Sequence, residues 1–291
     1  MRLTKLAWRA PLLALLMSVG VGAEARVGPA QTEELSKPVE HGSKTTYFDL
    51  LRMLLPDLTP DATAHKTVPL RSLSEQAGRA AIEGDIEFEF KPYRFRSEGR
   101  RLLMLWVEIK SDGANEDTPY AGEAVVAAVY RLGPKAELLD ALEVKTDRFT
   151  GFWNDRPLLR LDARNDAFVV YSTHWNAGES YETLDVLFVD AGRIKTVASR
   201  FLYNTQGCGV GFTETPTFQA LPDPGRKYPR LLLTVRLRKE SDGSECDRRT
   251  RGYTRYYRGV YRWNAARRRY ETSSRQLERL DKFDERRVSQ P

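Results

Sequence analysis

Histidine and cysteine are scarce in this chain, and their scarcity narrows the chemistry that it can perform. Its 291 residues include three histidines, His41, His65 and His174, and two cysteines, Cys208 and Cys246. No histidine lies near either cysteine in the sequence, so the clustered ligands of a typical zinc site are not expected. A Gly-x-Ser-x-Gly nucleophile elbow and a His-Glu-x-x-His motif are both missing. We therefore predict neither a metal nor a cofactor.

Long apolar runs are missing beyond the first 25 residues. Within those residues, basic Arg2, Lys5 and Arg9 precede the apolar run 11–21, and the small-x-small site Ala23-Glu24-Ala25 follows it. This order is typical of a secretory signal peptide, and the run is shorter than the roughly 20 residues that span a bilayer. The sequence therefore predicts cleavage near Ala25, no transmembrane segment in the mature chain, and a periplasmic or secreted protein.

The two cysteines are interpreted in the light of that compartment. In an oxidising environment an even pair predicts a disulfide, here between Cys208 and Cys246, which are 38 positions apart. Closing a loop of this size stabilises a fold by roughly 3–4 kcal/mol in the chain-entropy model. The alternative, a metal-binding or catalytic thiol pair, is less favoured because no further ligand accompanies it.

Charge is unevenly distributed along the chain. Residues 226–291 hold 20 basic and 9 acidic residues, whereas residues 26–225 hold 23 basic and 30 acidic ones. Such asymmetry indicates either an anionic partner or electrostatic matching of the two parts. Arginine also outnumbers lysine by 34 to 12, which suits a GC-rich bacterium and makes the periplasm the expected compartment.

The pattern of residues divides the mature chain into three parts. Residues 26–44 are polar, contain two prolines and show no period, which predicts a flexible tether. Residues 45–83 form a helical and loop lead-in, with a helix over 47–55 that Pro56 ends and a second helix within 73–82. Residues 84–291 are predicted to form an antiparallel β domain that closes with a charged amphipathic helix over 275–288.

Period-two alternation and turn residues locate the strands of that domain. The predicted strands cover residues 85–90, 102–110, 124–132, 137–145, 158–162, 167–175, 181–189, 193–203, 231–239, 253–263 and 269–272. Three times, a buried strand is followed by a hairpin that carries an aromatic residue, at Tyr130, Phe188 and Tyr261. The predicted fold class is therefore mainly β, built from antiparallel modules in a propeller-like or a multi-sheet arrangement.

The richest polar loop candidate follows the strand over 167–175. Here His174, Glu179 and Glu182 form a set suited to acid–base catalysis or metal binding, and Trp175 offers a surface on which a sugar can stack. The alternative is a hairpin turn at 176–178 with solvated acids. Two other loops, 112–117 and 207–211, resemble a calcium loop and a nucleotide loop, but both lack the required ligand spacing and are interpreted as turns.

The C-terminal part interleaves arginine with aromatic residues. Arg255, Tyr257 and Tyr261 alternate with Arg258 and Arg262 along one predicted strand that ends at Trp263. Such a surface suits phosphates or acidic sugars, through paired guanidinium hydrogen bonds and stacking. The alternative is a ladder of arginine and aromatic side chains that pairs with the acidic remainder of the domain.

These features favour a non-enzymatic binding or scaffold protein of the bacterial cell envelope. Its expected ligand is an anionic envelope component, such as a polysaccharide, lipopolysaccharide or membrane head groups, bound through the basic aromatic strand together with Trp175; nucleic acid is not expected. The alternative function is an envelope hydrolase that cleaves a sugar or an ester through His174, Glu179 and Glu182.

Overall fold

The computed structural model describes residues 29–73, 80–111, 123–144, 149–153, 157–207, 209–241 and 251–288. The three helices are α1 (Pro29–Ser36), α2 (Tyr47–Leu54) and α3 (Arg275–Val288). The strands are β1 (Ala64–Lys66), β2 (Arg71–Ser72), β3 (Glu83–Ser97), β4 (Arg100–Ser111), β5 (Glu123–Arg131), β6 (Glu137–Glu143), β7 (Phe149–Phe152), β8 (Leu158–Arg160), β9 (Asp166–Asn176), β10 (Glu179–Asp190), β11 (Arg193–Gly207), β12 (Val210–Leu221), β13 (Arg230–Ser241), β14 (Tyr253–Asn264) and β15 (Arg269–Glu271).

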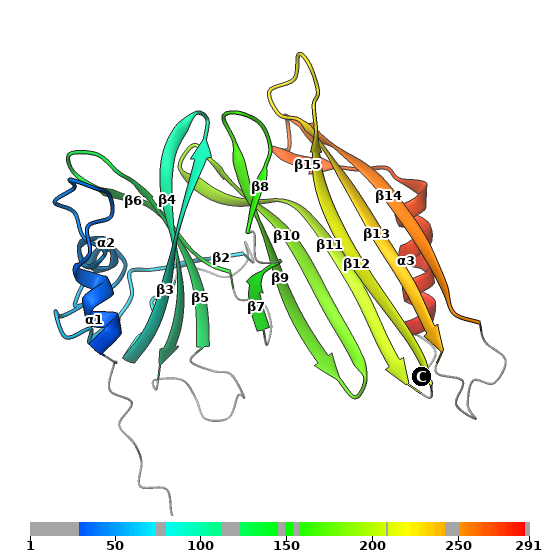
Figure 1. Ribbon diagram of the computed structural model, residues 1–291, viewed down its shortest axis with the longest axis horizontal. Helices are drawn as coiled ribbons and strands as arrows, with labels where there is room; N and C mark the ends of the chain where they lie inside the picture. The colour runs from blue at the N-terminus through cyan, green and yellow to red at the C-terminus, as the bar shows by residue number, and fades with distance from the viewer. Residues whose placement is uncertain are drawn as a thin grey trace, which may run out of the picture.

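The first sheet has six strands in the order β1-β3-β4-β5-β6-β2, and Figure 1 shows α1 and α2 beside it. Its pairs are antiparallel except β2 with β6. Helix α2 begins with a capping box between Thr46 and Asp49 and buries Leu50, Leu51 and Leu54 against one face of the sheet. The stripe of apolar residues at helical spacing thus covers a sheet face, as its sequence pattern requires.

The second sheet has nine strands, in the order β15-β14-β13-β12-β11-β10-β9-β7, with β8 also paired to β9. It curves into a half-barrel, and α3 lies along β14 (Figure 1). The inner faces of its two halves and the apolar stripe of α3 share one core, to which Leu184, Leu233 and Leu280 contribute. Strands β11 and β12 pair only between residues 205–207 and 210–212 and then diverge.

Two prolines lie inside long strands, and both lie where the strand has a neighbour on one side only. Pro216 of β12 pairs with Val235, but β11 does not reach that position. Pro92 of β3 pairs with Leu105, while β1 extends only as far as Ile86. Because proline has no N–H to donate, such open edges are the sites in a sheet that tolerate it.

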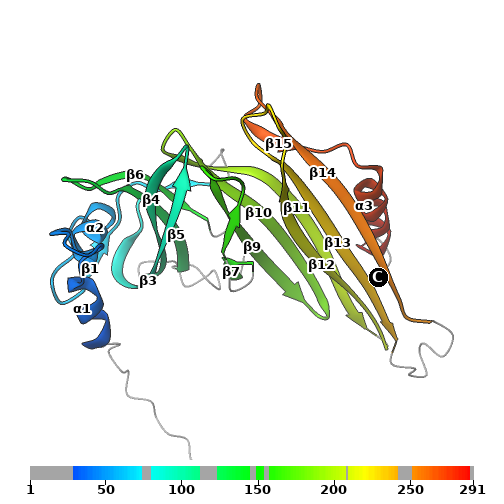
Figure 2. The same ribbon diagram turned by 45° about the horizontal axis from the view of Figure 1, so that its top comes forward.

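The two sheets pack against each other through a third apolar cluster, which includes Trp106, Phe152 and Phe168. The rings of Trp106 and Phe152 lie 4.2 Å apart between centroids, and Phe168 packs edge-on against Phe95 at 5.1 Å. The layers therefore run from α1 and α2 through the first sheet to the second sheet and α3 (Figure 2).

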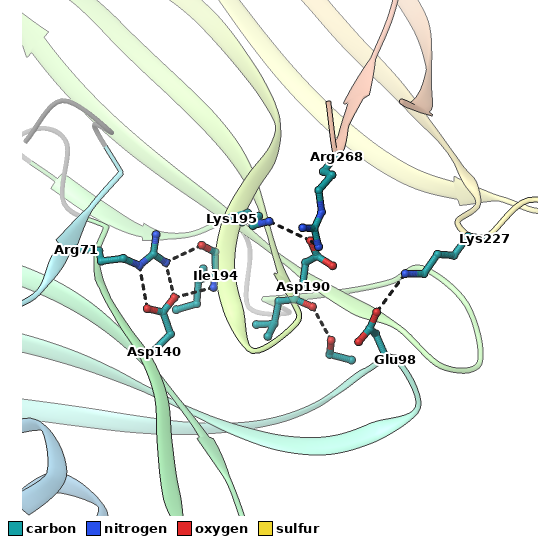
Figure 3. Close-up of polar contacts among 10 residues, drawn as sticks. Arg71, Glu98, Asp140, Asp190, Ile194, Lys195, Lys227 and Arg268 are labelled. Atoms are coloured by element: carbon teal, nitrogen blue, oxygen red, sulfur yellow. Dashed lines mark hydrogen bonds and ion pairs between the residues drawn. The ribbon is translucent and has the colours of Figure 1, made fainter. Parts of the chain in front are cut away.

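Hydrogen bonds and ion pairs also join the two sheets along the seam, the boundary at which the sheets pack against each other (Figure 3). Asp140 of β6 accepts from Arg71 Nε at 2.9 Å and from the backbone N–H of Ile194, on β11, at 2.8 Å. Arg71 also donates to the Ile194 carbonyl at 2.8 Å. Farther along the seam, Lys227 pairs with Glu98 at 3.1 Å. The buried carboxylate of Asp140 thus links both sheets through one set of hydrogen bonds.

Replacing Asp140 by alanine should destabilise the fold by about 2–3 kcal/mol, because it leaves a buried N–H and a partly buried guanidinium without an acceptor. Glu137→Ala on the same strand removes only an exposed pair with Arg131 and should cost less than about 1 kcal/mol. Urea unfolding of both variants measures the difference, and equal losses would contradict the assigned role of Asp140.

The mainly antiparallel β fold with a C-terminal helix is confirmed, in its multi-sheet form. The prediction of a flexible tether over residues 26–44 is corrected, because α1 forms over residues 29–36 and Leu35 and Val39 are buried in the first core. The second predicted helix, within 73–82, stays a prediction over most of its length because residues 74–79 lie outside the described residues, although Ala80 near its end forms a β-bridge with Leu70. Strand β12 was not predicted, since Pro216 interrupts its pattern.

Candidate functional site

The predicted turn between β9 and β10 is present. Ala177 and Gly178 both have positive φ angles, 42° and 94°, as a two-residue hairpin turn requires. A Cβ atom at Gly178 would lie 2.4 Å from the carbonyl oxygen of Gln206, so glycine is needed for the close approach of β11. The turn is thereby anchored, and the flanking side chains of β9 and β10 project from a paired hairpin.

Glu179 and Glu182 project from opposite faces of β10, because they are three positions apart and successive side chains of a strand alternate between its faces. Glu179 accepts hydrogen bonds from the hydroxyls of Tyr181 and Tyr203, both at 2.6 Å. These two donors hold the pKa of Glu179 below its ordinary value. Glu182 accepts from Ser180 at 3.2 Å and Asn204 at 2.9 Å, and burial raises its pKa above the ordinary value.

His174 pairs directly with Tyr181 across the hairpin, and the centroids of these two rings lie 6.5 Å apart. Because Tyr181 and Glu179 are two positions apart on β10, His174 shares the face of Glu179. Trp175 pairs with Ser180, shares the face of Glu182 and is 54% exposed. The structure therefore brings His174 together with Glu179 but separates both from Glu182 and Trp175. A three-residue catalytic set on one surface is not formed.

The predicted basic aromatic strand is β14, and its two faces differ. Tyr257, Tyr261 and Trp263 turn inward and pack in the core of the second sheet, where Tyr261 is 6% exposed. A Cβ atom at Gly259 would lie 2.3 Å from Leu277 of α3, so the helix docks directly on this face. Tyr261 therefore belongs to the core and Tyr257 and Trp263 pack against it, while their expected role in ligand binding stays a prediction.

Arg255 of the same strand lies over the ring of Tyr253, at 4.5 Å from its centroid. Arg258 and Arg262 are on the outer, exposed face. Because β12, β13 and β14 pair in register, side chains of three strands form rows on that face, such as Thr215–Arg236–Tyr256 and Thr217–Thr234–Arg258.

We call this surface the arginine–threonine face. It comprises Arg236, Arg238, Arg258 and Arg262 with Tyr256, Thr213, Thr215, Thr217, Thr234 and Thr254. Helix α3 covers the opposite, inner face of these strands, and in Figure 1 it lies behind them. Arg238 pairs with Glu240 at 2.8 Å, whereas Arg236 and Arg258 form no ion pair with any described residue. Tyr256 is 58% exposed in their midst.

Sequence reasoning missed Arg236 and Arg238, although the signal was present. In β13 these arginines alternate with the buried residues Val235 and Leu237, so a period-two pattern places them on the solvent side. Register with β14 then brings them beside Tyr256 and Thr254. This pairing depends on tertiary structure and does not follow from the separate strands.

The remaining predicted sites fall outside the described residues or have no counterpart within them. Cys208, Cys246 and loop 112–117 lie outside the described residues. In the part of the chain that is described, no group of three or more histidine, cysteine or acidic side chains could hold a metal ion. No helix there is long and apolar enough to cross a membrane.

Comparison with known proteins gives no further identification. The sequence matches no protein-family model, and neither a curated protein nor a solved structure matches the chain. The arrangement of its own side chains is therefore the basis for assigning a function.

Proposed function

We propose that this chain is an exported, non-enzymatic binding protein of the bacterial cell envelope, and that its arginine–threonine face binds an anionic polysaccharide or lipopolysaccharide. The observation that carries the proposal is the charge on this face. Arg236 and Arg238 project from β13 and Arg258 and Arg262 from the paired strand β14, and Glu240 balances only Arg238. The apolar N-terminal segment supports export, as its pattern is typical of a signal peptide.

The spacing of the guanidinium groups suits a chain that carries repeated anions. Residues of one face lie about 6.6–6.8 Å apart along a strand and about 4.8 Å apart between strands. Arginine donates paired hydrogen bonds to phosphate or carboxylate groups, and the short threonines between the arginines leave access to them. Tyr256 adds an exposed ring on which a sugar can stack.

A hydrolase remains the alternative, and the placement of its candidate residues gives it less support. His174 and Glu179 share a face, but both oxygens of Glu179 already accept tyrosine hydroxyls, and its pKa is lowered. A general acid needs a raised pKa to hold its proton near neutral pH. Activity that is lost in His174→Ala or Glu179→Gln, with stability retained, would favour this alternative.

The double variant Arg236→Glu/Arg258→Glu tests the binding proposal. We expect it to bind heparin and purified lipopolysaccharide at least about tenfold more weakly at low salt, since two charge-assisted contacts are replaced by repulsion. Wild-type affinity should also fall as salt is raised. Titration by fluorescence anisotropy and elution from a heparin column measure both effects.

The matched control is Arg193→Glu/Arg279→Glu, which makes the same change in net charge at exposed positions of β11 and α3. It should retain most of the affinity. Equal losses in the two double variants would show that net charge, rather than this face, governs binding, and would refute the assignment of the site.

A further inference from the structure

A groove of about 760 Å³ lies at the outer end of the seam between the sheets, away from the arginine–threonine face. The β3–β4 hairpin forms one side, and β8 with the start of β9 forms the other. Its volume is within the range of roughly 300–1,000 Å³ that is typical of small-molecule sites. None of the residues proposed above to bind polymer lines it.

Four arginines line the groove, and only two carboxylates accompany them. They are Arg94, Arg96, Arg101 and Arg160. Glu40 pairs with Arg94 at 2.5 Å. Asp166 accepts from Arg160 at 3.1 Å and from the backbone N–H of Arg96 at 2.8 Å. The two acids are therefore already engaged, and the lining carries a net positive charge.

Among the described residues, neither Arg96 nor Arg101 pairs its guanidinium with a carboxylate, and Arg96 donates instead to the Ala163 carbonyl at 2.9 Å. Arg101 is the more exposed of the two. It is exposed, and it lies directly opposite Arg96 in the β3–β4 ladder. Like charges at directly opposed positions destabilise a sheet. The pair is thus an electrostatic cost to the fold that a bound anion would offset.

Apolar side chains line the same groove beside these charges. Phe95 and Leu102 belong to the core between the sheets, with exposures of 3% and 6%. Leu158 of β8 is a large apolar side chain that is 36% exposed to solvent. A ligand that covered Leu158 would remove apolar surface from water while its charged end reached the arginines.

We propose that this groove binds a single-chain amphiphilic anion, with its carboxylate or phosphate head at Arg101 and Arg96 and its hydrocarbon chain along Leu158. The head would take hydrogen bonds from the guanidinium groups, and the chain would pack on apolar side chains. The proposal is independent of the polymer-binding function, because no residue of the arginine–threonine face lines this groove.

Isothermal titration with monomeric dodecanoate tests this site. Arg101→Glu should weaken binding at least about tenfold, and Leu158→Ser should also weaken it. Because Arg101→Glu places a carboxylate opposite Arg96, it should raise Tm while it weakens binding, an outcome that a structural role of Arg101 would not produce. Arg193→Glu, with the same charge change at an exposed position, should bind as wild type does.

Further probes separate the parts of the proposal. Dodecanol and inorganic phosphate should each bind far more weakly than dodecanoate, because each lacks one half of the amphiphile. Arg236→Glu/Arg258→Glu should retain dodecanoate binding. If wild type fails to bind dodecanoate, or if Arg101→Glu and Leu158→Ser both bind it with wild-type affinity, the proposal is wrong.

Discussion

Replacing Arg287 by leucine should destabilise the protein by about 3–5 kcal/mol, the usual cost of breaking a buried ion pair by removing one partner. Arg287 extends from the last turn of α3 and donates to Glu214 at 2.7 Å and to Asp284 at 2.5 Å. It also donates to the backbone carbonyl of Tyr203 at 2.7 Å. The side chains of Arg287, Glu214 and Asp284 are all at least nine-tenths buried.

Aromatic rings enclose the same guanidinium. The centroids of Tyr203, Phe212 and Phe283 lie 4.9–5.0 Å from its central carbon. Without Arg287, Glu214 and Asp284 would lose the one cation that both contact, and Arg200, which pairs with Asp281, would be left as the other cation that acts on Glu214. The substitution should therefore release the end of α3 from β11 and β12, at the point where those strands diverge.

Urea unfolding measures the loss, and Arg279→Leu on the exposed side of α3 is the control. We expect the control to lie within about 0.5 kcal/mol of wild type, as surface substitutions usually do. The triple variant Arg287→Met/Glu214→Leu/Asp284→Leu should recover most of the stability, because it removes the whole ionic set. A loss below about 1 kcal/mol in Arg287→Leu would contradict the buried position of this cluster.

This cluster illustrates what the sequence could and could not predict. The amphipathic period predicted α3 over 275–288, and Leu277 and Leu280 are buried as expected. Arg287, however, is one of many arginines in a basic segment. The helical period places it on the face of Leu277 and Leu280 and leaves Arg286 exposed, but it does not reveal the partner Glu214, which lies more than seventy residues earlier, in a strand that Pro216 conceals.

Most strands could be predicted because their apolar residues alternate or run continuously, as in β3 and β4. The predicted helix over 47–55 and α2 agree within one residue for the same reason. Helix α1 was missed because its stabilising contacts come from the core around Leu35 and Val39 rather than from its own period. Secondary structure was thus predictable wherever local pattern and tertiary burial agree.

The candidate sites were less predictable, because they depend on which face of a strand is buried. Alternation correctly divided β14 into two sets of residues, but charge and aromatic content did not reveal that Tyr257 and Tyr261 would face α3. The same rule, applied to Glu179 and Glu182, separates them onto opposite faces of β10. Strand register then decided which arginines share a surface.

The free energy of unfolding should decrease as pH rises above about 4.5, and Glu214 should be a main cause. Glu214 is 2% exposed, and its burial, together with the carboxyl group of Asp284, raises its pKa above the ordinary 4.5. The folded protein therefore keeps a proton that the unfolded chain has released. In this range the folded state binds more protons, so each rise in pH favours unfolding, by up to about 1.4 kcal/mol per pH unit for one group.

Glu214→Gln isolates this contribution, because the amide resembles the protonated acid and does not titrate. Urea unfolding at pH 5, 6, 7 and 8 should give the variant a flatter dependence than wild type, and its stability relative to wild type should increase with pH. Glu182 and Asp185, whose pKa values burial also raises, maintain part of the slope in both proteins. Glu278→Gln, at an exposed position of α3, should leave the slope unchanged. Parallel curves for wild type and Glu214→Gln would mean that Glu214 is ionised in the folded protein, so that Arg287 outweighs both burial and Asp284 in setting its charge.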